Sequence, residues 1–446
     1  MSKAGNRAER AEELIEQTGE ALDDGKHPMR IFNDDGIYER ELQRIFAKTW
    51  NFIGHESELE EPGDYARRYI GEDPYIFVRD EEGELHAFYD SCCHRGAQFV
   101  RAEQGNTSHF QCPYHGWTYR NDGELTVVPY EDERYDDLDK EAASLVEAEV
   151  ETYKGFVFAR VVEDGPSLDE YLEEFKWYLD IALDPTEEGL TVVGEPRRVR
   201  AEVDWKVPGE NFAGDSYHLA HTHGSSFELE YSSSIWERFD AAGPLSQSYS
   251  VMTDTHAGEY YLFDEEPIYM DYPEKIEDHM NSDLSERQRE MFSKSMFITG
   301  TIFPNASIWH GFNPIGGPWA SIRLWRPVGP GESEIVSWLL VPKELEDDEE
   351  FLERAKAGYQ SLSPGGVLEA DDTEVWSGIS ESSNSATAIE RDVRADISGG
   401  LEESDAVPIT DGSHGPGEVI RAGPYLDEVY ARTLFNSWHE FMSEQR

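Results

Sequence analysis

Two short segments that each contain a cysteine and a histidine constrain this chain most. They read SCCHRGAQF and FQCPYHGWTY, and 17 residues separate His94 from Cys112. In each segment a β-branched and aromatic stretch gives way to turn residues. The segments together supply two thiolates (Cys92, Cys112) and two imidazoles (His94, His115), a full set of four metal ligands. The sequence therefore predicts a small β domain that holds a metal group.

Tetrahedral zinc is one alternative for this ligand set. Common zinc fingers pair Cys with Cys and His with His, whereas each segment here carries one of each. That arrangement resembles a Rieske site, where two thiolates hold one iron of a [2Fe–2S] cluster and two imidazoles hold the other. The motifs CCHRGAQ and CPYHGWTY, with HESEL, PGDY and RNDGEL around them, resemble the cluster loops of ring-hydroxylating oxygenases. The resemblance implies that Cys92 and Cys112 bind one iron and His94 and His115 the other, with Cys93 as a non-ligand.

The pattern along the chain predicts three segments. Residues 1–47 form a polar arm and a helix that Asp34 or Asp35 can cap, and we expect this segment to pack with the catalytic domain. Residues 48–162 are rich in short strands and form the cluster domain. Residues 163–446 mix helices and strands and form the catalytic domain. The predicted fold class is α+β, with a small antiparallel β Rieske domain inserted before a larger, helix-grip-like catalytic domain that contains an antiparallel sheet.

A second cluster of titratable residues lies in WKVPGENFAGDSYHLAHTHGSS, residues 205–226. It holds Asp215, His218, His221 and His223. Mononuclear non-haem iron is typically bound by two histidines and one carboxylate, which leaves positions open for O2 and substrate. On a regular helix His218 and His221 share a face, whereas His218 and His223 diverge by about 140°. Helical geometry alone therefore favours His221 as the second ligand.

The stretch ENFAGDSYHLAHTH also resembles the oxygenase motif Asp-x-x-His-x-x-x-x-His. This resemblance implies His218 and His223 as the iron ligands, and it requires the helix to loosen or end before His223, which Gly224 permits. His221 then remains as a polar pocket residue. The third ligand must come from elsewhere, and VLEADDTEVW, residues 367–376, resembles the family's distal Asp-Asp helix. The second acid of that pair, Asp372, is the predicted ligand, and Asp371 is the residue with which it is most easily confused.

Two further residues acquire roles at the iron. Asp215 lies one helical turn before His218 and can accept a hydrogen bond from that ligand's free N–H. By resemblance it also reaches the cluster histidine His115 of a neighbouring subunit, because the two metals of one chain would be too far apart. The resemblance therefore implies a homotrimer, or an α3β3 assembly with a small β subunit. Asn211 is expected near the iron without necessarily binding it.

From about residue 30 onward the chain resembles the large (alpha) subunit of Rieske non-haem iron aromatic-ring-hydroxylating dioxygenases. The resemblance implies electrons from NAD(P)H through a reductase and usually a ferredoxin, and conversion of an aromatic substrate and O2 into a cis-dihydrodiol. A monooxygenase or N-demethylase of a quaternary amine, and a Rieske electron carrier without catalytic iron, remain alternatives. The residues expected to line a substrate pocket are Phe212, Leu219, His221, His310, Leu362 and Leu368.

The charge of the chain restricts its surroundings. The chain has 93 acidic and 38 basic residues, which gives a formal net charge of −55, and the acids are spread throughout the sequence. Self-repulsion of this size destabilises a compact state in dilute salt, and molar salt screens it. We therefore predict a high-salt cytoplasm and exclude nucleic acids and anionic membranes as partners. The three cysteines form no disulfide framework, and no apolar run suggests a leader or a membrane span.

Overall fold

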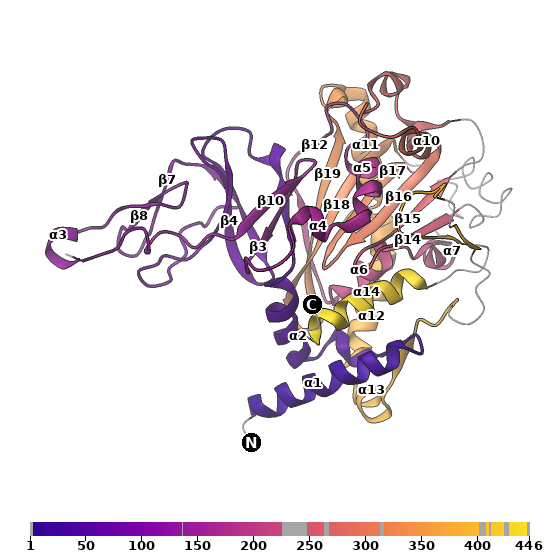
Figure 1. The fold of residues 1–446 in the computed structure, drawn as a ribbon, viewed down its shortest axis with the longest axis horizontal. Coiled ribbons are helices and arrows are strands. Elements are labelled where there is room, and N and C mark those ends of the chain that lie inside the picture. The colour runs from indigo at the N-terminus through magenta and orange to yellow at the C-terminus, as the bar shows by residue number, and fades with distance from the viewer. Residues whose placement is uncertain are drawn as a thin grey trace. The chain divides into compact units, whose positions relative to one another are not determined.

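The computed structural model describes residues 3–135, 137–224, 248–262, 267–312, 316–400, 407–409, 412–422 and 428–443. The chain divides into two compact units, one of residues Phe46–Tyr171 and one of Met1–Ile45 with Leu172–Arg446 (Figure 1). The first unit contains small antiparallel sheets, and the second combines helices with one large antiparallel sheet. The predicted α+β fold class is confirmed.

The smaller unit consists of three antiparallel sheets. The first contains β2 (Asn51–His55), β10 (Glu149–Tyr153) and β11 (Phe156–Arg160). The second contains β3 (Asp64–Ile70), β4 (Asp73–Arg79), β5 (Leu85–Tyr89) and β6 (Gln104–Asn106). The third contains β7 (His109–Gln111), β8 (Thr118–Arg120) and β9 (Leu125–Val127), and the short helices α3 (Glu131–Arg134) and α4 (Leu168–Tyr171) complete the unit.

An apolar core lies directly beneath the cysteine-histidine loops. Cys92 and Cys112 are both members of it, and they pack with residues of β4, β5, β7, β8 and β9. Its buried members are Ile76, Val78, Phe88, Cys92, Val100, Phe110, Cys112, Trp117, Tyr119, Leu125, Val128 and Leu145. Because the two cysteines are part of one core, the packing of this unit fixes the two loops next to each other.

The larger unit is built on a sheet whose ten described strands pair antiparallel throughout. The order is β12 (Leu190–Val192), β19 (Glu332–Pro342), β18 (Pro318–Gly329), β17 (Ala306–Phe312), β16 (Ser295–Ile302), β15 (Ala257–Leu262), β14 (Ser248–Met252), β22 (Glu418–Ala422) and β21 (Val407–Pro408), and β13 (Arg197–Ala201) also pairs with β19. The central strands are buried along nearly their whole length. Such burial requires that both faces of the sheet be covered.

Alternation along β17 separates the two faces of this sheet. Ser307 accepts a hydrogen bond from Trp325, whose ring packs on Phe212 of α6 (Lys206–Phe212). Three residues further on, His310 points the other way and contacts Ala182 of α5 (Lys176–Leu183). Helix α10 (Glu286–Lys294) lies on the α5 face through Phe292.

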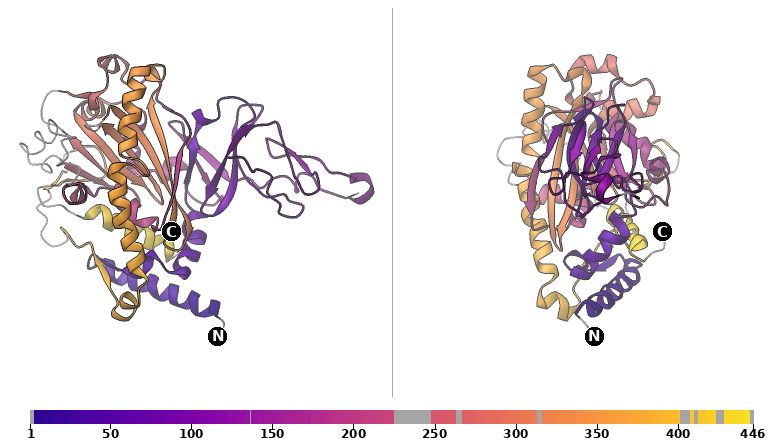
Figure 2. Two further views of the ribbon diagram at one scale, coloured as in Figure 1. Left: turned by 180° about the vertical axis from the view of Figure 1, so that it is seen from behind. Right: turned by 90° about the vertical axis from the view of Figure 1, so that its left-hand side faces the viewer.

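Three long helices share the α6 face of the sheet. They are α11 (Glu349–Ser361), α12 (Val367–Ser383) and α14 (Val429–Met442). Figure 2 shows α11 and α12 running along the sheet in the view from behind. Helix α12 reaches this face through Trp376, which packs on Trp325 of β18. The short helices α7 (Leu219–Thr222) and α13 (Ala386–Arg391) also belong to this unit.

The N-terminal segment belongs to the larger unit. It contains α1 (Lys3–Leu22), β1 (Lys26–Pro28), which pairs with β20 (Arg394–Asp396), and α2 (Asp35–Glu41). Of the two candidates for the cap of α2, Asp34 and Asp35, the structure has Asp34 as the capping residue, whose carboxylate accepts from the amides of Gly36 and Ile37. At the other end of α2 the buried Glu41 pairs with Lys206 at 2.6 Å and accepts a hydrogen bond from Trp438 at 2.7 Å. This ion pair attaches the N-terminal segment to the start of α6 and to α14.

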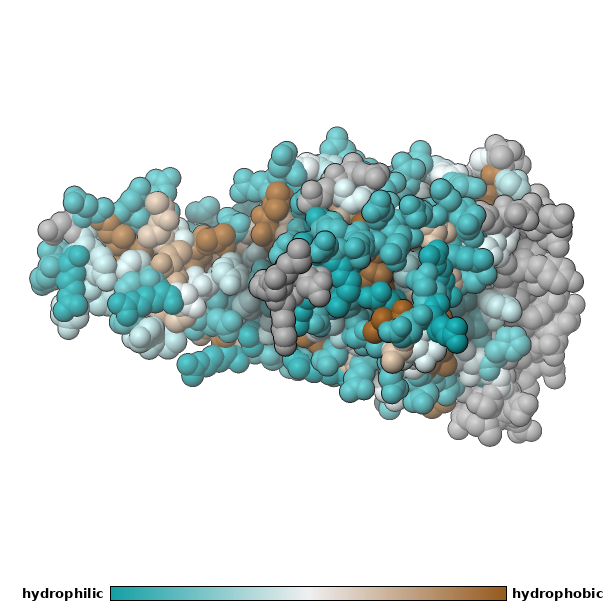
Figure 3. Space-filling model, turned by 90° about the horizontal axis from the view of Figure 1, so that it is seen from below, coloured by the Kyte–Doolittle hydropathy of each residue, from teal (hydrophilic) through white to brown (hydrophobic). Residues whose placement is uncertain are grey.

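The molecular surface reflects the acidic composition. The described part of the face drawn in Figure 3 is predominantly hydrophilic, and apolar side chains appear on it in small separate groups. Among the described helices, none has the length and apolar character needed to cross a membrane.

Candidate metal centres

The two cysteine-histidine loops have the same local geometry. The amide of Gly96 donates to the carbonyl of Cys92 at 2.7 Å, and that of Gly116 donates to Cys112 at 3.0 Å. Both glycines have a positive φ, +71° and +76°, a conformation that L side chains rarely adopt. A glycine four residues after each cysteine thus lets each loop turn back over its own thiol.

In these loops the two cysteine side chains lie together, and so do the two histidine rings. Cys92 and Cys112 are each 2% exposed, neither is in a disulfide, and their thiols interact. The rings of His94 and His115 lie edge to face with centroids 4.6 Å apart. Burial, with a contribution from Cys112, raises the pKa of Cys92, so a bound cation would be needed to stabilise both thiolates. Two thiols beside two imidazoles fit the donor set of a Rieske cluster.

The orientation of His94 is also suited to a metal. Its Nδ1 atom is buried and has no hydrogen-bond partner within the described chain, while Nε2 lies 3.3 Å from the hydroxyl of Tyr135. Trp117 stacks on the ring at 4.8 Å between centroids, nearly parallel. One nitrogen is therefore left for a ligand bond. Cys93 is exposed and its thiol contacts the Ser144 carbonyl, in keeping with a non-ligand.

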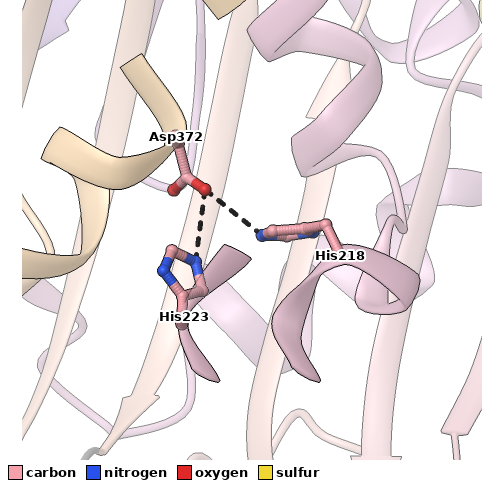
Figure 4. A group of neighbouring side chains, drawn as sticks. All are labelled: His218, His223 and Asp372. Carbon is pink, nitrogen blue, oxygen red and sulfur yellow. Dashed lines mark ion pairs between the residues drawn. The ribbon is translucent and has the colours of Figure 1, made fainter. Parts of the chain in front are cut away.

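In the larger unit the structure brings His218, His223 and Asp372 together (Figure 4). Asp372 Oδ1 lies 3.5 Å from His218 Nε2 and 3.2 Å from His223 Nε2. One potential ligand atom from each residue lies within 4.8 Å of the others. Two imidazoles and one carboxylate that converge on a single point are the donor set of a mononuclear iron site.

The backbone explains why His223, and not His221, joins this group. Helix α6 ends at Phe212, a 3-10 turn covers Ser216–His218, and α7 ends before His223. The angle of a continuous helix therefore does not apply between His218 and His223. His221 is exposed and its ring lies near Tyr217. The helical argument for His221 fails because the segment is not one helix.

Burial along helix α12 distinguishes the two adjacent acids, Asp371 and Asp372. Its buried residues recur every three or four positions: Glu369, Asp372, Trp376, Ser380 and Ser383. Consecutive helical residues point about 100° apart, and the side chains of Asp372 and Asp371 are 4% and 37% exposed. Asp372 lies within the buried stripe, whereas Asp371 lies at its edge.

Asp215 and Asn211 surround the outer nitrogen of His218. Asp215 Oδ2 is 3.4 Å from His218 Nδ1 and accepts a hydrogen bond of 3.0 Å from Asn211 Nδ2. Burial lowers the pKa of His218, but the hydrogen bond and charge of Asp215 and the charge of Asp372 outweigh it, so that the pKa is raised. Asp215 is thus placed to orient the imidazole.

No motif in the sequence singles out two acids, Glu259 and Glu210, that lie beside Asp215 with raised pKa values. Glu259 of β15 is 2% exposed and accepts hydrogen bonds from Ser216 and Ser248. Burial, aided by the charge of Asp215, raises its pKa to about 8. Glu210 of α6 is partly buried, and desolvation of its carboxyl raises its pKa well above the usual range. Among 93 acidic residues, no local pattern distinguishes these two from solvated ones.

The residues expected to line a substrate pocket are dispersed. Phe212 is buried against Trp325, and Leu219, Leu362 and Leu368 are partly buried. His310 lies on the opposite face of the sheet from Phe212. Its Nδ1 contacts the Ala182 carbonyl at 2.6 Å and its Nε2 contacts the Tyr272 hydroxyl at 2.8 Å. Burial lowers the pKa of His310 to about 4, so this residue is a neutral, hydrogen-bonded core histidine.

Comparison with known proteins places this geometry in context. Residues 49–154 match the model of the Rieske [2Fe-2S] domain, and residues 169–444 match that of the ring hydroxylating alpha subunit (catalytic domain). The benzene 1,2-dioxygenase subunit alpha of Pseudomonas putida is 34% identical over 429 residues, covering 94% of this chain and 91% of that protein. The N,N-dimethyl phenylurea N-demethylase subunit alpha of Sphingobium sp. (strain YBL2) is 34% identical over 387 residues, covering 83% of each.

Solved structures give the same relationship. Naphthalene 1,2-dioxygenase from Rhodococcus sp., bound to indole, superposes with a TM-score of 0.88 and 34% identity, covering 96% of this chain and 98% of that one. The quaternary ammonium Rieske monooxygenase CntA, in complex with an inhibitor, superposes with a TM-score of 0.66 at 18% identity, covering 94% of this chain and 96% of that one. The second likeness shows a shared fold.

Proposed function

Because the chain belongs to the family of ring-hydroxylating oxygenase alpha subunits, we propose that it converts an aromatic ring and O2 into a cis-dihydrodiol. The protein is the oxygenase component of a multicomponent oxidoreductase. Its cofactors are a Rieske [2Fe–2S] cluster and a mononuclear iron, and its electrons come from NAD(P)H through a reductase, with or without a ferredoxin.

One observation supports the oxygenase chemistry most: His218, His223 and Asp372 converge at one point, from segments far apart in the sequence. In the proposal these three side chains hold the iron, which when bound supplies coordination positions for O2 activation. The protein orients the two imidazoles and excludes water. Asp215 accepts the Nδ1–H of His218 and thereby directs the Nε2 lone pair toward the metal.

The proposed cluster ligands are Cys92 and Cys112 for one iron and His94 and His115 for the other. Residues 48–162 are the proposed cluster domain, residues 163–446 the proposed catalytic domain, and residues 1–47 the arm and helix that pack with it. We further propose that electrons leave through His115 toward Asp215 of a neighbouring subunit. This route requires a ring of subunits, either a homotrimer or an α3β3 assembly.

The proposed substrate is a neutral aromatic compound. Dioxygenases of benzene and biphenyl are among the relatives. Arg323, whose guanidinium lies 4.7 Å from the ring centroid of Phe212, is fully buried and paired with Glu369. Its charge is therefore already balanced and does not offer a partner to a substrate carboxylate.

N-demethylation is the second candidate function, and the Sphingobium relative favours it. The two reactions differ in where the oxygen atoms go. Dioxygenation places both atoms of one O2 molecule in the product. N-demethylation uses one atom to hydroxylate the methyl carbon, which then leaves as formaldehyde, and two electrons and two protons reduce the other atom to water. The test is turnover under 18O2 with the reconstituted electron-transfer chain, offered benzene, biphenyl and a dimethyl phenylurea. Formaldehyde and the unlabelled N-demethylated amine, with no doubly labelled diol from any of the three substrates, would overturn the dioxygenase proposal in favour of the demethylase.

Iron counting tests the proposal against a simple electron carrier. We expect three irons per chain in the wild type and two in His218→Ala, with the cluster absorption unchanged. His221→Ala is the matched control, because it removes an exposed histidine of the same segment and should retain three irons. Two irons in the wild type, unchanged by His218→Ala, would identify a carrier.

A further inference from the structure

The imidazole of His223 lies between two successive carboxylates of α12. Asp372 Oδ1 is 3.2 Å from Nε2, and Asp371 Oδ2 is 3.7 Å from Nδ1. Figure 4 shows the Nε2 side, where Asp372 reaches both His223 and His218. Each nitrogen of this ring therefore faces an acid, although the two acids are neighbours in the sequence.

The position of Asp371 differs from that of a solvated surface acid. Its side chain is 37% exposed, but Oδ2 itself is buried and has no hydrogen-bond donor within the described residues. A buried carboxylate oxygen without a donor is unfavourable. The polar atom that this oxygen faces is His223 Nδ1. Asp371 is also outside the group of ligand atoms formed by His218, His223 and Asp372.

We propose that Asp371 is a positioning residue that accepts the Nδ1–H of His223. A histidine that binds a metal through one nitrogen carries its proton on the other, and an acceptor there fixes the tautomer and ring orientation and raises the basicity of the ligand. Asp215 faces the corresponding nitrogen of His218, to which it offers both its main-chain carbonyl and, at 3.4 Å, its carboxylate. The outer nitrogen of each imidazole in the group thus faces a carboxylate. This inference rests on the proposed function only in that the group holds an iron.

The adjacent acids consequently have separate tasks. Because α12 turns about 100° per residue, Asp372 points into the group and Asp371 passes beside it. The distance of 3.7 Å exceeds a normal hydrogen bond, and hydrogen bonds in a site without its bound group are often long and tighten once that group is present.

The experiment measures Fe(II) affinity rather than turnover. The variants are Asp371→Asn, Asp371→Glu and the matched control Glu374→Gln, which removes one negative charge from the exposed side of the same helix. The protein retains its cluster and is depleted of mononuclear iron before anaerobic equilibrium dialysis against Fe(II). We expect Asp371→Asn to weaken binding by about 10- to 100-fold. Asp371→Glu should recover most of the affinity, and Glu374→Gln should bind as the wild type does.

Two further measurements exclude a purely structural effect. Thermal unfolding of the iron-depleted protein and the visible spectrum of the cluster should be the same in Asp371→Asn and the wild type. The visible spectrum of Co(II) bound at the depleted site should change in Asp371→Asn and not in Glu374→Gln, because it reports the orientation of the ligands.

Two outcomes would overturn the inference, and a third, distinguishable from them, would refute the proposed function instead. Equal Fe(II) affinity in Asp371→Asn and Glu374→Gln would overturn it. Complete loss of binding in Asp371→Asn, with binding kept in Asp372→Asn, would make Asp371 the ligand and would also overturn it. A wild-type protein that binds no Fe(II) would instead refute the proposed function.

Discussion

Asp215 contacts His218 and Asn211 through the same carboxylate. The change Asp215→Asn keeps the size of this side chain and removes its charge, so the packing around it should persist. We expect Asp215→Asn to retain three irons per chain and to lose most turnover, because the proposed electron route passes through this carboxylate. Iron content, the cluster spectrum and single-turnover product yield check this expectation. Full activity in this variant would refute the route while leaving the cluster assignment intact.

Glu259 predicts a pH dependence of stability. Burial raises its pKa to about 8 in the folded protein, against 4.5 for the free side chain. The folded state therefore holds a proton that the unfolded state has lost between these values, and the free energy of unfolding falls as pH rises from about 4.5 to about 8. The effect is on the order of a few kcal/mol. In Glu259→Gln the decline should be smaller, as measured by urea denaturation at constant salt.

The exposed Glu374→Gln is the control for this measurement and should keep the wild-type slope. A Glu259→Gln protein with an unchanged slope over the same pH range would show that Glu259 is ionised in the folded state.

At the scale of elements, the ion pair between Arg323 of β18 and Glu369 attaches helix α12, which carries Asp372, to the sheet. Both residues are fully buried, with Nε and Oε2 3.1 Å apart. Arg323 also donates to Ser321 and to the Leu362 carbonyl. Glu369 lies one helical turn before Asp372, so this pair determines the position of the proposed ligand.

The change Glu369→Gln leaves Arg323 buried without an anion, and we expect a loss of about 3–5 kcal/mol in the free energy of unfolding. The double variant Arg323→Met/Glu369→Gln removes both charges and should recover part of that loss. The free energy of unfolding of each variant is measured by denaturation in urea, which is uncharged, and the values are analysed as a double-mutant cycle. Strictly additive effects of Glu369→Gln and Arg323→Met would contradict a direct coupling.

At the scale of the whole molecule, the net charge of −55 predicts that salt stabilises the protein. The Debye length falls from about 10 Å at 0.1 M to about 3 Å at 1 M, which screens repulsion between surface carboxylates. The hydrophilic face in Figure 3 is the kind of surface on which this screening acts. We expect the unfolding temperature to rise steadily with KCl. A protein most stable in dilute buffer would contradict the proposed high-salt cytoplasm.

Mixed oligomers test the proposed route between subunits. A chain with His115→Ala lacks the proposed exit from the cluster, and a chain with Asp215→Asn lacks the acceptor, so each alone should be inactive. Co-expressed as one assembly, they create junctions in which an intact cluster faces an intact Asp215 of the next chain, and activity should return. Activity absent from verified mixed trimers would favour transfer within one chain.

Much of this protein could be predicted from short sequence motifs. The capping Asp34, the antiparallel β unit and the α+β class follow from turn residues, apolar periodicity and side-chain capping, which are local properties. The loop glycines Gly96 and Gly116 are also local, because each must adopt a positive φ in its own turn. Cys92, His94, Cys112 and His115 stand out because two loops repeat one pattern.

Other features depended on contacts between distant segments. The helical period alone pointed to His221, because it could not show that the chain leaves the helix between α6 and α7. The sequence likewise could not show that strand alternation brings the side chain of His310 against α5. In a chain with so many acids, the sequence does not reveal that Glu259 is buried. Its burial depends on the contact between β15 and the segment before His218.

The sequence by itself determined which residue types are present, where the turns fall and which loops carry thiols and imidazoles, because these depend on neighbours along the chain. The resemblance of the sequence to a family motif had already pointed to Asp372. Only the tertiary structure showed that Asp372 lies with His218 and His223 while Asp371 faces the other nitrogen of His223. The reason is geometric: one step along α12 changes the direction of a side chain by about 100°, and the direction that faces the histidines is set by how α12 packs on the sheet.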